Sequence, residues 1–467
     1  MALSLFLKKR INKCKELVAL LKDDFEYVSI LGNDTKSNAL TVDRKSTATR
    51  EGFEKDTGFV IKIANGDIIL EYATLDLKDL KKIKEDILQE YQARLAFKDL
   101  FKKITIKDDE VLTKDFVREN DIDKYQDTDL IKYLKDLNQK LLAKDQHILN
   151  AYTSIQKLNV SKIFVSKTKC LTQQYTWING YIFVIYKGDN GKIVNAREGS
   201  YSHLIKDVLD DLPKHLDHLI DKADHLTKAQ NIKPGVYDII SHPSISGLIA
   251  HEAFGHGVEM DQFTKNRALA QKYVNDYVAS PVVNMKDGAS SAFSTASYFF
   301  DDDGILAHDT QIIKDGILVG GLCDLASAKI LNYAATGNGR REKTTHKVYT
   351  RMTNTFFEPG QDLLDDMIKS IKHGFMLFET NNGMEDPKNW GIQCTCEYGI
   401  EIKDGKLTDN YYAPIVLSGN VLDLLKSITM VSKDLSVIGS GSCGKGYKEW
   451  VRVSDGGPYL KGRVKLS

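Results

Sequence analysis

The sequence predicts an α+β protein of two domains. One is an N-terminal mixed sheet with helices, and the other is a C-terminal, largely antiparallel β domain that carries the helix discussed below at His251–His256. Amphipathic helical segments and strand-like runs both occur in the first half, and strands dominate the second. At 467 residues the chain is long enough for two hydrophobic cores. Lys233-Pro234-Gly235 interrupts the pattern, so we place the domains at 1–232 and 233–467.

The N-terminal half begins with an amphipathic helix and continues into strands. Asn65-Gly66 lies between two apolar runs, which is a strong hairpin signal, and Asp189-Asn190-Gly191 predicts a second hairpin. The expected helices cover 4–22, 78–98, 129–143 and 203–230, and the expected strands cover 27–31, 59–64, 68–73 and a set within 147–198.

The C-terminal half opens with a strand at 236–241, which leads into a helix. Strands are expected to dominate afterwards. Lys314-Asp315-Gly316 and Lys403-Asp404-Gly405 each lie between apolar runs and predict hairpin turns. Two further helices are expected near 361–373 and 419–430.

Composition excludes several classes of protein. Hydrophobic residues make up 42% of the chain and charged residues 27%, as in soluble globular proteins. The formal net charge is zero, which argues against direct nucleic-acid binding. No apolar run is long enough to span a bilayer, and the opening MALSLFLKKR has its charges on the wrong side for a signal peptide. We therefore expect a cytoplasmic protein without a membrane partner.

The hexapeptide His251-Glu252-Ala253-Phe254-Gly255-His256 is the main functional signal. It reads HExxxH, one residue longer than the HExxH of ordinary zinc proteases. Two imidazoles can hold a metal, and a carboxylate between them can take a proton from the attacking water. Pro243 and Ser244 offer a helix start and cap before this motif.

The spacing of the two histidines requires a distorted helix. In HExxH the histidines lie about 40° apart around the helix axis, but in HExxxH they lie about 140° apart. A π-type turn restores the alignment because its hydrogen bonds run from i to i+5. Gly255 lies where such a distortion costs least. We expect a π-type turn or a helix end between Ala253 and Gly257.

A catalytic zinc usually has three protein ligands, so a third must be found. Glu259 could serve as ligand or as acceptor for a ligand imidazole. Cys443 lies in a glycine-rich segment that could approach a metal, although the segment by itself favours a free thiol in a loop. Cys394 and Cys396 would share one face of a strand, as core or surface thiols or as a replacement ligand. The six cysteines are scattered, so a disulfide framework is not expected.

The segment HEAFGHGVEMD resembles the metal motif of the TldD/PmbA family, the so-called modulators of DNA gyrase. Three more stretches match in the same order. They are Thr336–Glu342 (TGNGRRE), Arg351–Gly360 (RMTNTFFEPG), and Gly439–Gly446 (GSGSCGKG) followed by Ser454–Pro458 (SDGGP). The chain departs from the family pattern at Asn381–Asp386, where a glycine-rich GGQV-like segment is usual.

The resemblance implies a zinc metallopeptidase subunit of the TldD type, because PmbA-type (TldE) partners lack HExxxH. It implies Zn²⁺ held by His251, His256 and Cys443. It also implies unfolded or oligopeptide substrates admitted between subunits. The subunits would form a homodimer, or a heterodimer with a motif-lacking TldE/PmbA-type partner.

The predicted chemistry is zinc-assisted peptide hydrolysis with Glu252 as general base. A developing oxyanion needs a further donor. His346 is the first candidate for that catalytic role, and Tyr349 and Arg351 are candidates for substrate binding.

Other interpretations remain open. The chain could be a non-proteolytic zinc hydrolase such as an amidase, or an assembly subunit with a structural metal in a closed four-ligand site. His215, His218 and His225 could bind a metal with Asp221, although a solvated helix face is the simpler interpretation. Asp301–Gly304 could form a cation loop or a turn, and Arg340 with Arg341 could hold an anion.

Overall fold

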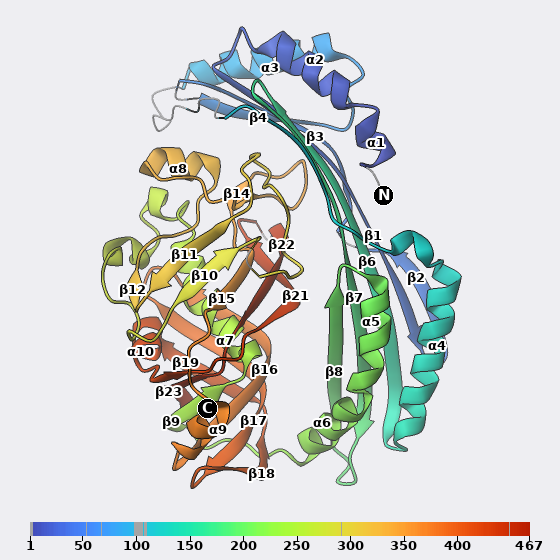
Figure 1. The fold of residues 1–467 in the computed structure, drawn as a ribbon, viewed down its shortest axis with the longest axis vertical. Coiled ribbons are helices and arrows are strands. Elements are labelled where there is room, and N and C mark those ends of the chain that lie inside the picture. Colours follow the sequence, from blue (N-terminus) through green and yellow to red (C-terminus); the bar gives the residue numbers. More distant parts are fainter. Residues whose placement is uncertain are drawn as a thin grey trace.

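The computed structural model describes residues 3–52, 54–66, 68–97, 106, 110–290, 292–447 and 449–467. The N-terminal half forms a long, curved sheet, and the C-terminal half is built from three smaller sheets. The two halves lie side by side along the long axis of the molecule (Figure 1). The fold is therefore α+β, as predicted. The position of a domain boundary near residue 232 stays a prediction.

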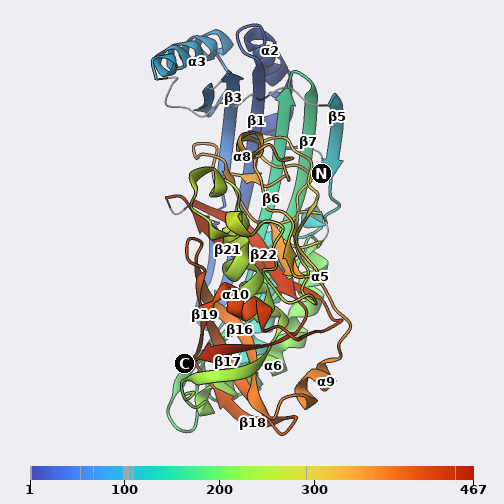
Figure 2. The same cartoon turned by 90° about the vertical axis from the view of Figure 1, so that its left-hand side faces the viewer.

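The N-terminal sheet has eight strands in the order β4-β3-β1-β6-β7-β5, with β2 paired to β1 and β8 paired to β7. It is mixed, because β5 runs parallel to β7 at one edge while the other pairs are antiparallel (Figure 2). The strands are β1 (Tyr27–Asp43), β2 (Thr47–Glu51), β3 (Asp56–Asn65), β4 (Ile68–Thr74), β5 (Leu112–Val117), β6 (Ile148–Ser166), β7 (Lys169–Lys187) and β8 (Ile193–Ser202).

The described residues of this half form six α-helices. They are α1 (Leu5–Lys8), α2 (Ile11–Leu21), α3 (Leu80–Leu95), α4 (Asp127–Lys144), α5 (Ile205–Asp211) and α6 (Leu216–Lys228). Ile155 and Ile182 of the sheet pack with the helices α4 to α6, whereas Leu158 and Trp177 pack against Tyr298 of the C-terminal half. Because side chains alternate along a strand, the long strands bury both faces, one under helices and one under the second half of the chain.

The C-terminal half contains a small closed barrel. Strands β16, β9, β23, β19 and β17 pair in that order, and β16 also pairs with β17, which closes the ring. The flanking strands β18 and β20 pair with β17 and β23. The bounds are β9 (Gly235–Ser241), β16 (His373–Asp386), β17 (Gly391–Lys403), β18 (Lys406–Tyr412), β19 (Ile415–Asn420), β20 (Met430–Val431) and β23 (Leu460–Leu466).

A six-stranded sheet, β12-β11-β10-β15-β22-β21, and a two-stranded sheet, β13-β14, complete this half. Their bounds are β10 (Met285–Gly288), β11 (Asp309–Lys314), β12 (Ile317–Leu318), β13 (Gly339–Arg340), β14 (Tyr349–Thr350), β15 (Asn354–Phe357), β21 (Ser436–Lys445) and β22 (Glu449–Gly457). The helices are α7 (Pro243–Leu248), α8 (Leu325–Leu331), α9 (Leu364–Lys369) and α10 (Val421–Lys426).

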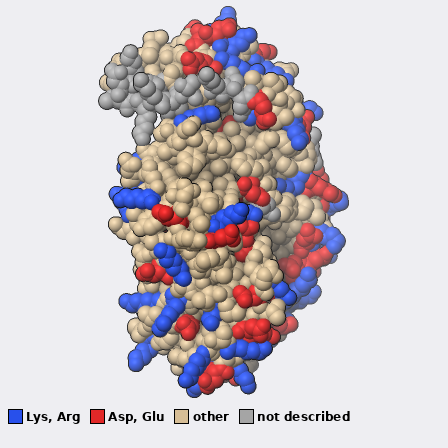
Figure 3. All heavy atoms as spheres, turned by 60° about the vertical axis from the view of Figure 1, so that its left-hand side comes forward, with Lys and Arg blue, Asp and Glu red and all other residues tan. Residues whose placement is uncertain are grey.

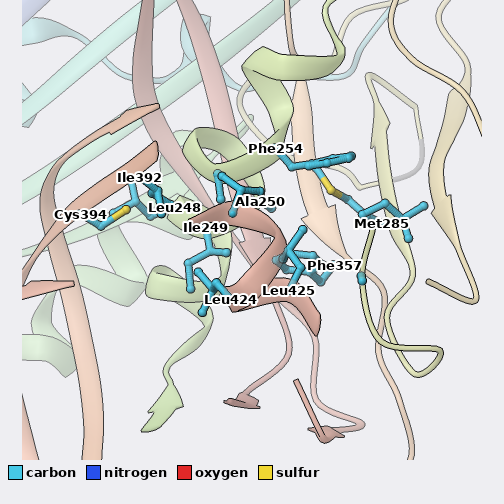
Figure 4. Close-up of a cluster of buried hydrophobic side chains, with 14 of the residues drawn as sticks. Leu248, Ile249, Ala250, Phe254, Met285, Phe357, Ile392, Cys394, Leu424 and Leu425 are labelled. Atoms are coloured by element: carbon cyan, nitrogen blue, oxygen red, sulfur yellow. The ribbon is translucent and has the colours of Figure 1, made fainter. Parts of the chain in front are cut away.

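Helix α7 and the π-helix that continues it lie inside this half. Leu248, Ile249 and Phe254 pack among Phe357 of β15 and Leu424 of α10 (Figure 4). The helix is therefore surrounded by apolar side chains, and its polar residues must find partners within the protein.

The predicted elements are largely present, and the differences have local causes. The helix expected at 4–22 is interrupted at Lys9–Arg10. The one expected at 203–230 has a 3-10 turn at Leu212–His215, because Pro213 cannot donate an N–H to the helix. Residue 98, the end of a predicted helix, lies outside the described residues. The expectation that strands dominate after the metal helix fails between 259 and 308, where β10 is the one strand among described residues.

The surface agrees with the balanced composition. On the face shown in Figure 3, basic and acidic side chains are interspersed. No helix among the described residues is long and apolar enough to cross a membrane.

Candidate metal centre

The metal helix begins where β9 leaves the barrel. His242 is the N-cap, and its Nδ1 accepts a hydrogen bond from the N–H of Ser244 at 3.3 Å. Pro243 occupies the first helical turn, where a missing N–H costs nothing. Every residue of α7 is buried, so the barrel and the six-stranded sheet fix the direction in which the helix runs.

A π-helix at Ile249–Gly255 carries the HExxxH motif. The N–H of His256 bonds to the carbonyl of His251, five residues earlier. This wider turn brings both imidazoles to one side, with ring centroids 5.1 Å apart and planes at 84°. The predicted π-type distortion is confirmed.

Cys443 completes the cluster from a different element. It lies on β21, which pairs with β22. Its Sγ lies 3.4 Å from His256 Nε2, and one ligand atom from each of His251, His256 and Cys443 lies within 4.8 Å of the others. Within the described part of the chain this is the one group of three or more such side chains that could hold a metal ion. Cys394 and Cys396 are buried core thiols on β17 and do not belong to it.

The three side chains polarise one another. Burial alone would raise the pKa of the Cys443 thiol, but His256 and His251 bring it well below its ordinary value. Burial would lower the pKa of both imidazoles, but the charge of Cys443 raises each of them, that of His256 well above its ordinary value. One thiolate and two imidazoles are donors that suit a borderline-soft divalent metal such as zinc. A bound metal would take the place of the protons that these three groups hold between them.

Glu252 lies beside the cluster without a hydrogen-bond partner among the described side chains. Its Oε2 is 4.0 Å from His256 Nε2, and its side chain is 18% exposed. Burial raises its pKa, against the lowering effect of His251 and His256. Gly383 of β16 packs directly against it, since a β-carbon there would lie 2.5 Å from Glu252 Cγ. Glu252 can therefore accept a proton from a molecule bound at the cluster.

Glu259 supports His256 from behind. Its Oε2 lies 3.2 Å from His256 Nδ1 and accepts a hydrogen bond from Lys445 Nζ at 2.9 Å. Lys445 also donates to Asp261 Oδ1 at 2.7 Å. Glu259 therefore acts as an acceptor for a ligand imidazole, one of the two roles expected for it, and the cluster keeps three protein donors.

Comparison with known proteins identifies the family. Residues 234–463 match the model of the PmbA/TldA metallopeptidase C-terminal domain. The chain belongs to the PmbA/TldD metallopeptidase family. It is 26% identical to a metalloprotease of Methanocaldococcus jannaschii over 95% of this chain and 97% of the relative. A zinc metalloprotease TldD homolog of Saccharolobus solfataricus is 29% identical over 58% of this chain and 62% of the relative.

Solved structures show the same fold. A crystal structure from Thermotoga maritima, titled as a modulator of a DNA gyrase, superposes with a TM-score of 0.79 at 17% identity, covering 98% of this chain and 99% of that one. TldE from Thermococcus kodakarensis superposes with a TM-score of 0.72 at 16% identity, covering 97% of this chain and 100% of that one. The arrangement of sheets around the metal helix is thus a feature of the PmbA/TldD fold.

The other predicted site residues lie around the cluster. Arg351 is fully buried and donates a hydrogen bond to the backbone carbonyl of Cys443, so it braces the strand that carries the thiol. His346 and Tyr349 line a cavity of about 510 Å³ whose lining contains none of the three clustered residues. His346 Nδ1 lies 3.4 Å from Glu342 Oε2.

The alternative metal site on the helical segment 203–230 does not form, because each of its three histidines has a different partner. His215 pairs with Asp211, His218 pairs with Glu198, and His225 stacks on Tyr411 with ring centroids 4.0 Å apart.

The predicted anion loop and cation loop are both occupied by internal contacts. Arg341 makes a two-pronged ion pair with Glu71, and Arg340 donates to the backbone carbonyls of Met352 and Arg452. Asp302 and Asp303 pair with Lys162 and Lys62. Within the described residues these charges join the two halves of the chain.

Lys445 was missed from sequence, although its spacing carried a signal. It lies two residues after Cys443 on the same strand, so both side chains point to the same face. Lys445 therefore faces the metal helix, where it pairs with Glu259. If Gly439–Gly446 had been predicted as a strand, the side chain of Lys445 would have been expected on the same face as Cys443.

Proposed function

We propose that this chain is a zinc peptidase that cleaves unfolded or oligopeptide chains. The observation that carries the proposal is the cluster of His251, His256 and Cys443, with the carboxylate of Glu252 4.0 Å from His256 Nε2. Two imidazoles and one thiolate fit zinc, and the Saccharolobus relative is named as a zinc metalloprotease. When bound, zinc supplies a Lewis acid that brings the pKa of water to about 7.

Glu252 has the position of a general base. It accepts a proton from the attacking water and returns it to the leaving amine. Burial raises its pKa, which makes the carboxylate a stronger base than an exposed glutamate. Gly383 of β16 packs against the Glu252 side chain, so this strand runs directly beside the general base.

The substrate is proposed to bind as an added strand. One edge of β16 pairs with β17 along its length, but the other edge pairs with β9 only from Gly374 to Leu377. Beyond Leu377 this second edge is without a strand partner among the described residues, and it runs past Glu252 at Gly383. An extended peptide can pair with such an edge, whereas most of the backbone of a folded protein is already hydrogen-bonded within its own helices and sheets.

Dimerisation is proposed to complete the site, either between two copies or with a motif-lacking partner of the TldE/PmbA type. Tyr447, on the turn after Cys443, is 96% exposed, and Trp450 is 47% exposed. Apolar side chains at this tip favour contact with another subunit. Light scattering on the active enzyme tests this, and an active monomer at assay concentration would contradict it.

The function is tested with Glu252→Gln and the surface control Glu16→Gln. Each protein is loaded with zinc, and zinc content and cleavage of an unfolded protein are measured. We expect Glu252→Gln to retain zinc and to lose cleavage by about 10²-fold or more, because general bases contribute on that scale. Cleavage at the wild-type rate by zinc-loaded Glu252→Gln would refute the assignment.

A further inference from the structure

His251 and His256 differ in whether their Nδ1 atom has a hydrogen-bond partner. Nδ1 of His256 faces Glu259. Nδ1 of His251 is buried and has no hydrogen-bond partner among the described residues. The ring nitrogen of His251 that belongs to the cluster lies within 4.8 Å of the ligand atoms of His256 and Cys443. A histidine that ligates a metal normally donates its other N–H to a carboxylate, a carbonyl or water, so an acceptor for His251 is missing.

Asp455 lies where that acceptor is needed. It is on β22, which packs along α7. Its Oδ1 lies 2.6 Å from the point where a β-carbon on Gly247 would stand. Gly247 precedes His251 by four residues, and a helical side chain covers the turn before its own α-carbon. Asp455 and the β22 backbone at Gly456 therefore lie against the face of the helix that also carries His251, at a position where only a glycine fits.

Asp455 has no competing partner. Neither a hydrogen bond nor an ion pair joins its carboxylate to another side chain in the described part of the chain. Burial raises the pKa of Asp455 to about 6. Of the nearby charged groups, His251 has the larger effect and lowers this pKa, and Glu252 has a smaller effect and raises it. A half-buried carboxylate without a side-chain partner, lying against the helix one turn before His251, is placed to serve that imidazole.

We propose that Asp455 accepts the Nδ1 proton of His251 in the metal-loaded protein, as Glu259 does for His256. The inference rests on the zinc site of the proposed function. No hydrogen bond joins the two groups in this structure, so the proposal requires a rotation of the aspartate side chain or one bridging water. Asp455 is thus a positioning residue, which fixes the ring orientation of His251 so that Nε2 is held toward the thiolate.

The test compares Asp455→Ala, which has no acceptor, with Asp455→Asn, which keeps a neutral one. Asp434→Asn on the surface is the control. Zinc affinity is measured by chelator competition, and imidazole N–H protons are observed by NMR on zinc-loaded protein with ¹⁵N-labelled histidine. We expect zinc affinity to fall about 10- to 100-fold for Asp455→Ala and by less for Asp455→Asn, the usual scale for such support.

The NMR signals separate this role from a general loss of structure. In the wild type we expect two downfield N–H resonances, one from each imidazole. The Glu259→Gln variant should lose the resonance of His256, and the Asp455→Ala variant should lose the resonance of His251. In Asp455→Asn the His251 resonance should shift upfield, which gives a result even if the alanine variant does not fold. Unchanged zinc affinity and an unmoved His251 signal in the variants would overturn the proposal. A wild-type protein that binds no zinc would overturn it together with the proposed function.

Discussion

Glu259 Oε2 lies 3.2 Å from Nδ1 of His256 and accepts a hydrogen bond from Lys445 Nζ at 2.9 Å. One carboxylate therefore joins a metal-binding imidazole to the strand that carries Cys443. Burial would raise the pKa of Glu259, but Lys445 and His256 lower it well below its ordinary value. The carboxylate is charged at neutral pH and gives His256 a fixed tautomer with Nε2 toward the thiolate.

We predict that Glu259→Gln weakens zinc binding about 10- to 100-fold, because a neutral amide holds the imidazole less firmly and removes one of the two carboxylates paired with Lys445. Chelator competition measures the change. Glu16→Gln, on the exposed face of α2, is the control. Equal zinc affinity in the wild type and Glu259→Gln would show that this carboxylate does not support the site.

Gly255 is predicted to be essential for the π-helix. A β-carbon there would overlap Met352 Sδ and would lie 3.0 Å from the carbonyl oxygen of Ala250. We expect Gly255→Val to lower zinc occupancy and to cost about 1–3 kcal/mol of stability, as overpacking does in well-packed cores. Zinc content and thermal unfolding measure both effects. Gly419→Val is the control, because nothing lies within 4 Å of that position. A valine variant with full zinc would contradict the prediction.

The ion pairs between the two halves predict a pH dependence of stability. Burial would raise the pKa of Glu71, but Lys62 and Arg341 lower it from 4.5 to about 2. Its stabilising contribution is thus fully present above about pH 4.5 and is lost as the pH falls towards about 2. The shift corresponds to about 3 kcal/mol.

We therefore expect Glu71→Gln to be less stable than the wild type by about this amount at pH 7, with the difference vanishing near pH 2. Denaturant unfolding at several pH values measures it. A constant difference across this range would contradict the ion-pair explanation.

The metal helix could be predicted from sequence because its signals are local. The five-residue spacing of His251 and His256 is incompatible with a regular α-helix, so a π-type turn followed from geometry alone. The hairpin turns at Asn65-Gly66, Asp315-Gly316 and Asp404-Gly405 were likewise determined by residues within each turn.

Features that depend on distant contacts could not be predicted in the same way. Strand β1 continues from Leu31 to Asp43 because β6 pairs with it there, although this part of the sequence has no regular alternation. The third donor, Cys443, was placed through family resemblance, since nothing in its own segment distinguishes a ligand from a free thiol. Asp455 was noticed within a motif, but its nearness to His251 depends on how β22 packs on α7.

X-ray absorption at the zinc edge tests the ligand set most directly. If His251, His256 and Cys443 hold the metal, zinc-loaded wild-type protein has one sulfur at about 2.3 Å and nitrogen ligands at about 2.0–2.1 Å. The sulfur signal should disappear in Cys443→Ser and persist in Cys394→Ala and Cys396→Ala. A zinc spectrum without sulfur in the wild type, or one whose sulfur is lost in Cys396→Ala and kept in Cys443→Ser, would contradict this assignment.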